Sequence, residues 1–364
     1  MRNIIYSIYF YITSISISGI EKLSIYNPYN LSGFFLLIIF FFLKEKKIKK
    51  EYIFYIFFLV ANLIFNFEKQ GLLLLVSLSP ILYKSFLKKN IKYLRKYVNI
   101  QLIILMTIFI IDFIYRFKGN YNLILLSLKS FLLNNRTIIN FYTYKVNSIM
   151  YADTNYTAII IGITFLYYLH LEKYKIVRIK YYKWLCIFLL IFTFSRAAII
   201  SIIISLFYKK YNGLLKKYKL IVGTGMIIMF ISILPKIIDK LKEDNSISTR
   251  FELINLFFNK VTDLNIMEIL LGVGFTNSNF ILGEYGHNFI VVMTLEGGIL
   301  FFLLLVWIFI LMWIEYKKFR EILIYFILCI MSVTQYNYIF IFVILTTLKA
   351  IEEVKNDKCN NGNL

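Results

Sequence analysis

The 364-residue sequence has few of the residues that interrupt helices or form cross-links. With only 3 prolines and 15 glycines, long uninterrupted helices are possible. The 3 cysteines, Cys186, Cys329 and Cys359, are scattered and form no CxxC pair, so neither a disulfide framework nor a thiolate metal site is indicated. No cleavable signal peptide is expected, because the first apolar stretch ends in Glu21-Lys22 and not in small residues.

Apolar residues, in contrast, are abundant and make up 60% of the chain. Apolar runs separated by basic clusters predict about twelve transmembrane or partly inserted helices, at roughly 3–20, 31–43, 52–67, 71–83, 97–115, 151–170, 184–195, 197–208, 219–234, 288–314, 322–334 and 336–348. No run alternates as a barrel strand does, and a helix satisfies its own backbone hydrogen bonds inside a bilayer. We therefore predict an all-α polytopic membrane protein, with residues 1–364 forming a single membrane domain.

The basic clusters give these helices an orientation. With the N-terminus inside, most of the 41 lysines and arginines fall in cytoplasmic segments, whereas the long outer loops, 116–150 and 235–287, contain few. This bias follows the positive-inside rule and explains most of the net charge of +21, so nucleic acid is not an expected partner. The tail at 349–364 is then cytoplasmic, and we expect an interfacial helix within the loop at 116–150.

One consequence of this orientation concerns residues 184–208, which lie between the basic segments 173–183 and 209–219. If both flanks are cytoplasmic, this stretch must fold as a hairpin of two helices, each about 18 Å long. The tip, Phe194-Ser195-Arg196, would then carry Arg196 to the outer side. A charge at membrane depth favours a functional site, although an arginine that snorkels to lipid headgroups is the alternative.

The loop at 235–287 carries further candidate residues. Thr249 and Glu252 form a capping-box pattern that predicts a helix start, with Arg250 in the first helical position. A cation beside free backbone N–H groups favours an anion site, and a solvated loop arginine is the alternative. His287 stands at the outer mouth of a predicted span, where it could act as a general base or simply cap the span.

Four short motifs, in this order, resemble those of the bacterial O-antigen ligase and polymerase family. They are D-x-N (Asp153 and Asn155), T-F-S-R-A-A (193–198), S-x-R (248–250), and G-V-G-F followed by G-H-N and E-G-G, and together they cover roughly 150–314. The sequence departs from the family at 154–155, where T-N replaces the common P-N. The resemblance implies a GT-C-like glycosyltransferase architecture in the bacterial inner membrane.

The resemblance also implies an activity. The donor would be a glycan on undecaprenyl diphosphate, and neither a metal nor another cofactor is expected. A polymerase would transfer the donor to another glycan, whereas a ligase would transfer it to lipid A-core, and the modest outer loop favours a polymerase. A chain-length regulator or a flippase is a candidate protein partner. A flippase or exporter of lipid-linked glycans is the alternative from another class, disfavoured because the distinctive charges gather at the outer side and no repeat is visible.

The resemblance assigns roles to individual residues. His287 matches the family's general base, and Arg196 and Arg250 match arginines that hold the diphosphate. Asn155, Asn288 and Glu296 are the remaining candidates for substrate binding.

Overall fold

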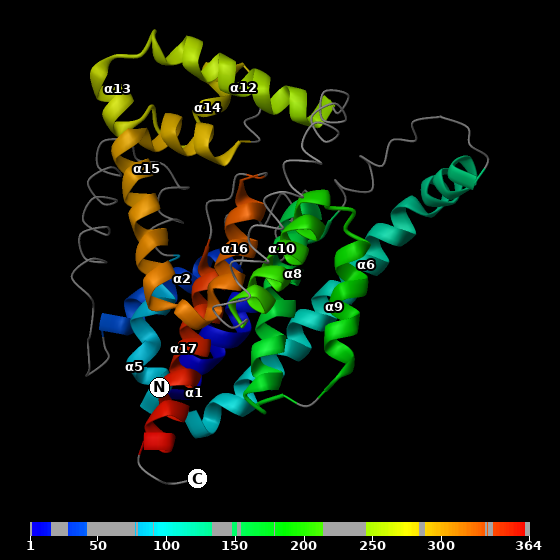
Figure 1. The fold of residues 1–364 in the computed structure, drawn as a ribbon, viewed down its shortest axis with the longest axis vertical. Coiled ribbons are helices and arrows are strands. Elements are labelled where there is room, and N and C mark those ends of the chain that lie inside the picture. The colour runs from blue at the N-terminus through cyan, green and yellow to red at the C-terminus, as the bar shows by residue number, and fades with distance from the viewer. Residues whose placement is uncertain are drawn as a thin grey trace. The chain divides into compact units, whose positions relative to one another are not determined.

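The computed structural model describes residues 2–15, 28–41, 77, 79–89, 91–132, 148–150, 154–177, 179–213, 245–283, 288–331, 333 and 338–360. Within these ranges every regular element is a helix, which confirms the all-α class (Figure 1). The chain forms two compact units, unit 1 within residues 1–50, 73–200 and 336–364, and unit 2 within residues 51–72 and 201–335. Each unit is described separately below.

Unit 1 is built on the packing of both chain ends against its middle. Its elements are α1 (Arg2–Tyr6) with a π-helical turn (Ser7–Tyr11) and a 3-10 turn (Ile12–Ser14), α2 (Pro28–Phe41), a 3-10 turn (Ser79–Tyr83), α5 (Lys84–Lys89), α6 (Ile91–Leu132), α8 (Thr154–Lys173), α9 (Tyr181–Ile191) and α17 (Ile339–Asn360). Helix α17 packs against α5 and α8, and α9 packs against α6 and α8. The Tyr9 hydroxyl donates to the Val343 carbonyl across the buried centre.

Helix α6 is longer than the sequence predicted. It runs for 42 residues, so the predicted span at 97–115 continues without a break into the predicted outer loop as far as Leu132. Asp112 and Arg116, which lie on either side of the predicted span end at 115, pair with each other within the helix. Residues 116–132, predicted as part of an outer loop that contains an interfacial helix, are thus helical and continuous with the span, while 133–147 lies outside the described residues.

The predicted tail is also largely helical. Helix α17 passes from the last predicted span to Asn360. Lys84 and Lys88 on α5 form ion pairs with Glu353 and Asp357, at nitrogen–oxygen distances of 2.7 and 2.9 Å respectively. Residues 349–360 are therefore an extension of the last helix, docked on unit 1.

Residues 184–208, which the sequence predicted to fold as a hairpin, form a helix, a tight turn and a second helix. Helix α9 ends at Ile191 and α10 (Arg196–Asn212) begins after the turn at 192–194, so the tip lies where the sequence placed it. The boundary between the two units falls within α10, after Ile200.

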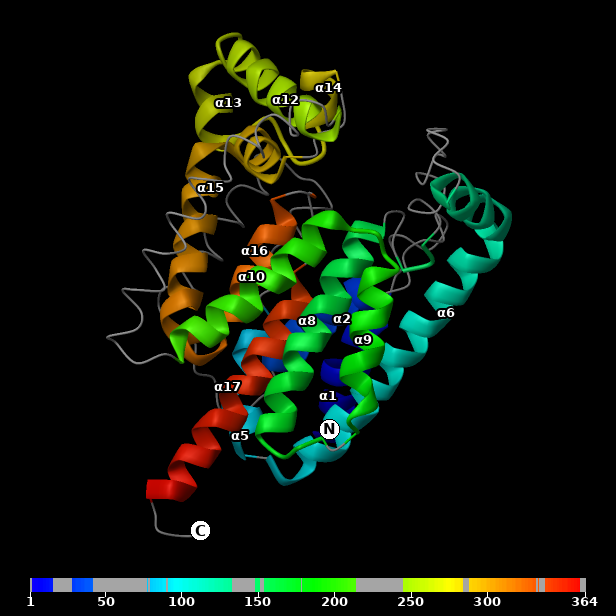
Figure 2. The ribbon, with the colours of Figure 1, turned by 45° about the vertical axis from the view of Figure 1, so that its right-hand side comes forward.

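Unit 2 carries the elements around the G-V-G-F and E-G-G motifs. They are α12 (Asn245–Val261), α13 (Ile266–Leu271), α14 (Ser278–Leu282), α15 (Phe289–Glu315), a 3-10 turn (Lys317–Phe319) and α16 (Arg320–Ile330). Helices α12, α14 and α15 bury a common apolar cluster formed by Leu253, Leu282, Val291 and Leu295. Gly298 has a non-helical backbone and bends α15 sharply, as Figures 1 and 2 show.

Among the residues that the structure describes, two helical segments are long and apolar enough to cross a membrane, Tyr93–Lys118 in α6 and Phe289–Glu315 in α15. Because α15 bends at Gly298, its straight part is residues 299–315, about 25 Å at ~1.5 Å per residue. The other predicted spans coincide with shorter helices or lie partly or wholly outside the described residues, as 52–67 and 219–234 do.

Candidate functional site

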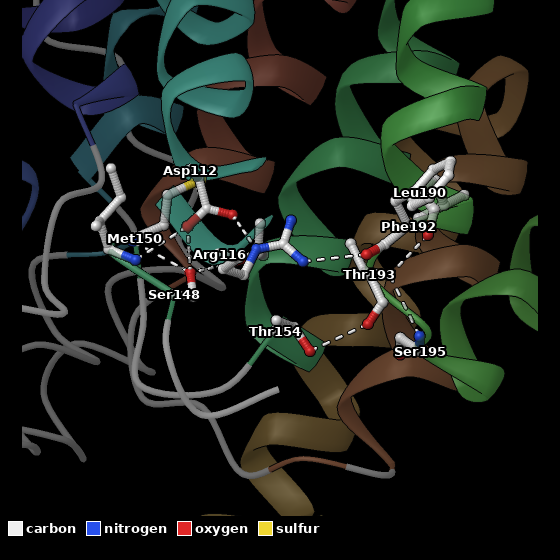
Figure 3. A network of polar contacts seen from close by, with 11 residues as sticks. Asp112, Arg116, Ser148, Met150, Thr154, Leu190, Phe192, Thr193 and Ser195 are labelled. Atoms are coloured by element: carbon white, nitrogen blue, oxygen red, sulfur yellow. Dashed lines mark hydrogen bonds and ion pairs between the residues drawn. The ribbon is translucent and has the colours of Figure 1, made fainter. Parts of the chain in front are cut away.

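A buried ion pair on α6 forms the centre of a polar network in unit 1 (Figure 3). Arg116 Nε donates to Asp112 Oδ2 at 2.8 Å, and neither side chain is exposed. The other carboxylate oxygen, Oδ1, accepts hydrogen bonds from the Ser148 hydroxyl at 2.7 Å and from the Ile149 N–H at 2.9 Å. Both oxygens of the buried carboxylate are thus satisfied, as a charge in an apolar helix bundle requires.

The network extends to the turn between α9 and α10. Arg116 Nη1 donates to the Phe192 carbonyl oxygen at 3.1 Å, so one guanidinium bridges α6 and the hairpin. On the other side, the Ser148 and Thr157 hydroxyls lie 2.9 Å apart, and Thr154 Oγ1 donates to the Thr193 carbonyl at 3.1 Å. The hairpin turn is therefore held from α6 and from the start of α8.

The turn itself has a strained and capped geometry. Phe194 adopts a φ of 53°, a left-handed conformation that a bulky side chain rarely occupies. Thr193 Oγ1 donates to the Leu190 carbonyl at 2.7 Å and accepts from the Ser195 N–H at 3.3 Å. Ser195 Oγ accepts from the Ala198 N–H at 3.4 Å, so Ser195 is the N-cap of α10. These bonds fix the point at which α10 begins.

Arg196 is the first residue of this 17-residue helix, and its side chain is exposed. The helix dipole places partial positive charge at the same end as the guanidinium. Two positive contributions at one exposed point favour an anion such as a phosphate group. The predicted Asn155 lies in the first turn of α8, next to Thr154, which bonds the hairpin turn. Two motifs of the family resemblance, around 154–155 and 193–198, thus meet in unit 1.

Two further motifs meet in unit 2, where the G-V-G-F segment runs beside the bend of α15. The Val273 N–H donates to the Leu295 carbonyl at 3.0 Å, and the Gly274 N–H donates to the Glu296 carbonyl at 3.1 Å. The approach requires glycine, because a Cβ on Gly272 would lie 2.1 Å from the Glu296 carbonyl oxygen. The glycines of the two motifs therefore permit a close backbone contact.

Asn288 and Glu296, both predicted to bind substrate, have structural partners in unit 2. Asn288 is the N-cap of α15, and its Oδ1 accepts from the N–H groups of Ile290 at 3.1 Å and Val291 at 3.4 Å. The Glu296 carboxylate is fully buried and accepts from the Ser278 hydroxyl at 2.6 Å. These contacts favour a role in shaping the site for both residues, and substrate binding by them stays a prediction.

The remaining candidates are Arg250 and His287. Helix α12 begins at Asn245, one turn earlier than predicted, so Thr249 is not its N-cap and Arg250 lies inside the helix. The helix extends upstream because residues 245–248 contain no proline or glycine to end it. The dipole argument for an anion at Arg250 is thereby removed. His287 lies outside the described residues, directly before the N-cap of α15.

Sequence reasoning missed Asp112 and Arg116, although a signal was present. An aspartate four residues before an arginine inside an apolar run is a pattern that pairs the two charges on one helix face. Because the predicted span ended at 115, Asp112 was assigned to the span and Arg116 to the outer loop. Their pairing on one helix was therefore not considered. No cluster of three or more histidine, cysteine, aspartate or glutamate side chains that could hold a metal lies within the described ranges.

The chain was compared with protein-family models, with curated proteins and with solved structures, and nothing in any of the three comparisons matches it.

Proposed function

We propose that this chain is a membrane-embedded glycosyltransferase, with about twelve inserted helices in a GT-C-like arrangement, that polymerises a bacterial polysaccharide. It transfers a glycan from undecaprenyl diphosphate to the end of an acceptor glycan. The observation that carries the proposal is the position of Arg196. It is an exposed, permanently charged group at the N-terminus of α10, directly after the turn from α9, which a buried network fixes.

The proposed chemistry uses residue types that suit a glycosyl diphosphate. The diphosphate is a good leaving group, so its departure requires charge stabilisation more than a proton donor. Arg196, and Arg250 by the resemblance, would bind phosphate oxygens through a fork of donors that stays charged at any physiological pH. His287 would take the proton from the acceptor hydroxyl as that oxygen attacks the anomeric carbon.

A location in the inner membrane is supported by apolar side chains on the surfaces of both units. Large exposed aliphatic residues occur along α6, α10 and α15, including Ile103, Ile114, Ile203, Leu303 and Ile314. Soluble proteins rarely expose such extended apolar surface, whereas lipid tails cover it without cost. With both termini in the cytoplasm, the hairpin tip faces the outer side.

Cysteine labelling tests this orientation at the two ends of α9. Lys180 and Arg196 are both exposed, one before α9 and one after the turn that follows it. In a Cys359→Ser background, we expect Arg196→Cys to react with a membrane-impermeant maleimide on intact spheroplasts. Lys180→Cys should react only after the membrane is permeabilised. The reverse pattern, or equal reactivity at both positions, would contradict the proposed topology.

The function is tested by complementation of a strain that lacks the native gene. We expect Arg196→Lys to reduce glycan transfer by about tenfold or more, because lysine keeps the charge but loses the planar fork. The matched control is Arg95→Lys, which makes the same change at an exposed position on α6. Full activity of Arg196→Lys would refute the proposed role of Arg196.

The glycan pattern on a gel separates polymerase from the two alternatives. A polymerase defect leaves single repeats attached to the core, whereas a ligase defect leaves the core bare and the glycan on the polyprenol. A flippase defect leaves single repeat units on the polyprenol at the cytoplasmic face.

A further inference from the structure

We infer that Asp112 and Arg116 are positioning residues for the hairpin tip, holding Arg196 where it meets the diphosphate of the donor. The inference rests on the proposed function. It assigns a role to two residues that carry no motif of the family resemblance and that lie on a different helix from Arg196.

The first argument is the cost of the pair. Both side chains are 0% exposed, in a helix long and apolar enough to cross a membrane. Removing two charges from water is repaid only when the geometry is good and the remaining donors and acceptors are satisfied. A pair of apolar residues would pack this site at less cost. The presence of this buried pair therefore indicates a role that apolar side chains could not fill.

The second argument is what the guanidinium joins. Its Nε binds the carboxylate on its own helix, and its Nη1 reaches the Phe192 carbonyl, 3.1 Å away on the turn that follows α9. A rigid fork can serve two acceptors at once, whereas a lysine ammonium is a flexible point charge. Arg116 thus sets the distance between α6 and the turn that precedes Arg196.

The third argument is the range of the network. Asp112 also binds Ser148 and the Ile149 N–H, and Ser148 contacts Thr157 on α8. The Thr154 hydroxyl on α8 donates a hydrogen bond to the Thr193 carbonyl in the turn between α9 and α10. The turn is thereby fixed from two directions, and the left-handed Phe194 is held within it. Because the turn is already ordered before the diphosphate binds, binding costs less conformational entropy. The affinity for the diphosphate is therefore higher.

The test uses Arg116→Lys in the full-length protein in lipid nanodiscs, with undecaprenyl diphosphate as the probe. Lysine keeps the charge opposite Asp112 but cannot also bridge to Phe192. Losing one charge-assisted hydrogen bond should weaken probe binding by about tenfold. Arg95→Lys, on the same helix, should leave binding unchanged. Spin labels at Ile111→Cys and Ile191→Cys, in the Cys359→Ser background, should give a broader distance distribution in Arg116→Lys.

A double-mutant cycle separates positioning from a direct contact with the probe. In an Arg196→Ala background, Arg116→Lys should cause little further loss of affinity, because the residue that it positions is gone. Additive losses would overturn the inference, as would an unchanged label distance in Arg116→Lys. If Arg196→Ala binds the probe normally, the proposed function fails, while the label distances still decide whether Arg116 orders the tip.

A second variant covers the case in which Arg116→Lys does not fold. Thr154→Val removes the hydroxyl that donates to the Thr193 carbonyl and nearly preserves the shape of the side chain. It should broaden the same label distance and weaken probe binding in the same direction, by a smaller factor. A folded Thr154→Val protein with native distances and native binding would also overturn the inference.

Discussion

Replacing His287 with alanine is expected to slow glycan transfer by about 10²–10⁴-fold, the usual contribution of a positioned general base. The acceptor hydroxyl is a weak nucleophile until a base takes its proton. Only neutral imidazole can accept that proton, so activity of the unchanged protein should rise with pH through the neutral range. His287→Ala should lose this dependence together with the rate. Transfer from a synthetic undecaprenyl-diphosphate donor, followed across pH in detergent or nanodiscs, measures both effects.

The control for His287→Ala is His170→Ala, which removes the only other histidine. His170 is buried near the C-terminal end of α8, at the end opposite to Thr154. We expect this variant to keep the pH dependence of transfer, even if its overall yield falls. A pH dependence that survives in His287→Ala, or that disappears in His170→Ala, would remove His287 from the catalytic role.

The helix break between α9 and α10 was predictable because charge constrains topology more strongly than local sequence does. Nothing within residues 184–208 marks a helix end, since the stretch contains no proline or glycine. The prediction came from the basic residues on both sides, which place both flanks in the cytoplasm. The structure has α9 and α10 meeting at the predicted tip. The bonds that shape the tip were not predictable, because the partners of Phe192 and Thr193 lie on α6 and α8.

The bend in α15 shows the limit of apolar runs as a guide to spans. Residues 288–314 were predicted to form a single span, because apolar residues dominate the stretch on both sides of Glu296. The two glycines at 297–298 permitted a bend but did not require one, because a glycine within a helix is tolerated at a modest cost. What requires the bend is the backbone of Val273 and Gly274, which donates to the carbonyls of Leu295 and Glu296. Hydrogen bonds between segments that are distant in the sequence leave no periodic pattern in it from which they could be predicted.

Substituting alanine for Gly298 is expected to destabilise unit 2 by about 4 kcal/mol or more, at the upper end for single substitutions. Two costs combine at this position. Gly298 has a φ of 76° and a ψ of 169°, a backbone conformation essentially restricted to glycine, which costs a residue with a Cβ about 1–3 kcal/mol. The new Cβ would also lie 2.3 Å from the Leu270 carbonyl oxygen and 2.5 Å from the Gly272 nitrogen, and backbone atoms cannot rotate away. Thermal unfolding of the purified protein in detergent measures the loss.

Gly283→Ala is the control for a positive φ without a steric clash, because Gly283 is in the left-handed helical region. Gly283 also has a positive φ, of 70°, but a Cβ there meets no atom within 4 Å. We expect this variant to lose only the ~1–2 kcal/mol of conformational strain. Equal losses in the two variants would mean that the contact between the G-V-G-F segment and α15 contributes nothing.

The same comparison links the fold to the proposed chemistry. The bend sets the direction of residues 289–297, and His287 directly precedes this segment and its N-cap, Asn288. If Gly298→Ala folds at low temperature, its kcat should fall further than its donor affinity, because a base must be placed more accurately than a binding surface. A variant with native kcat and a lowered melting temperature would show that the junction serves stability alone. In that case the glycine motifs would need another explanation than catalysis.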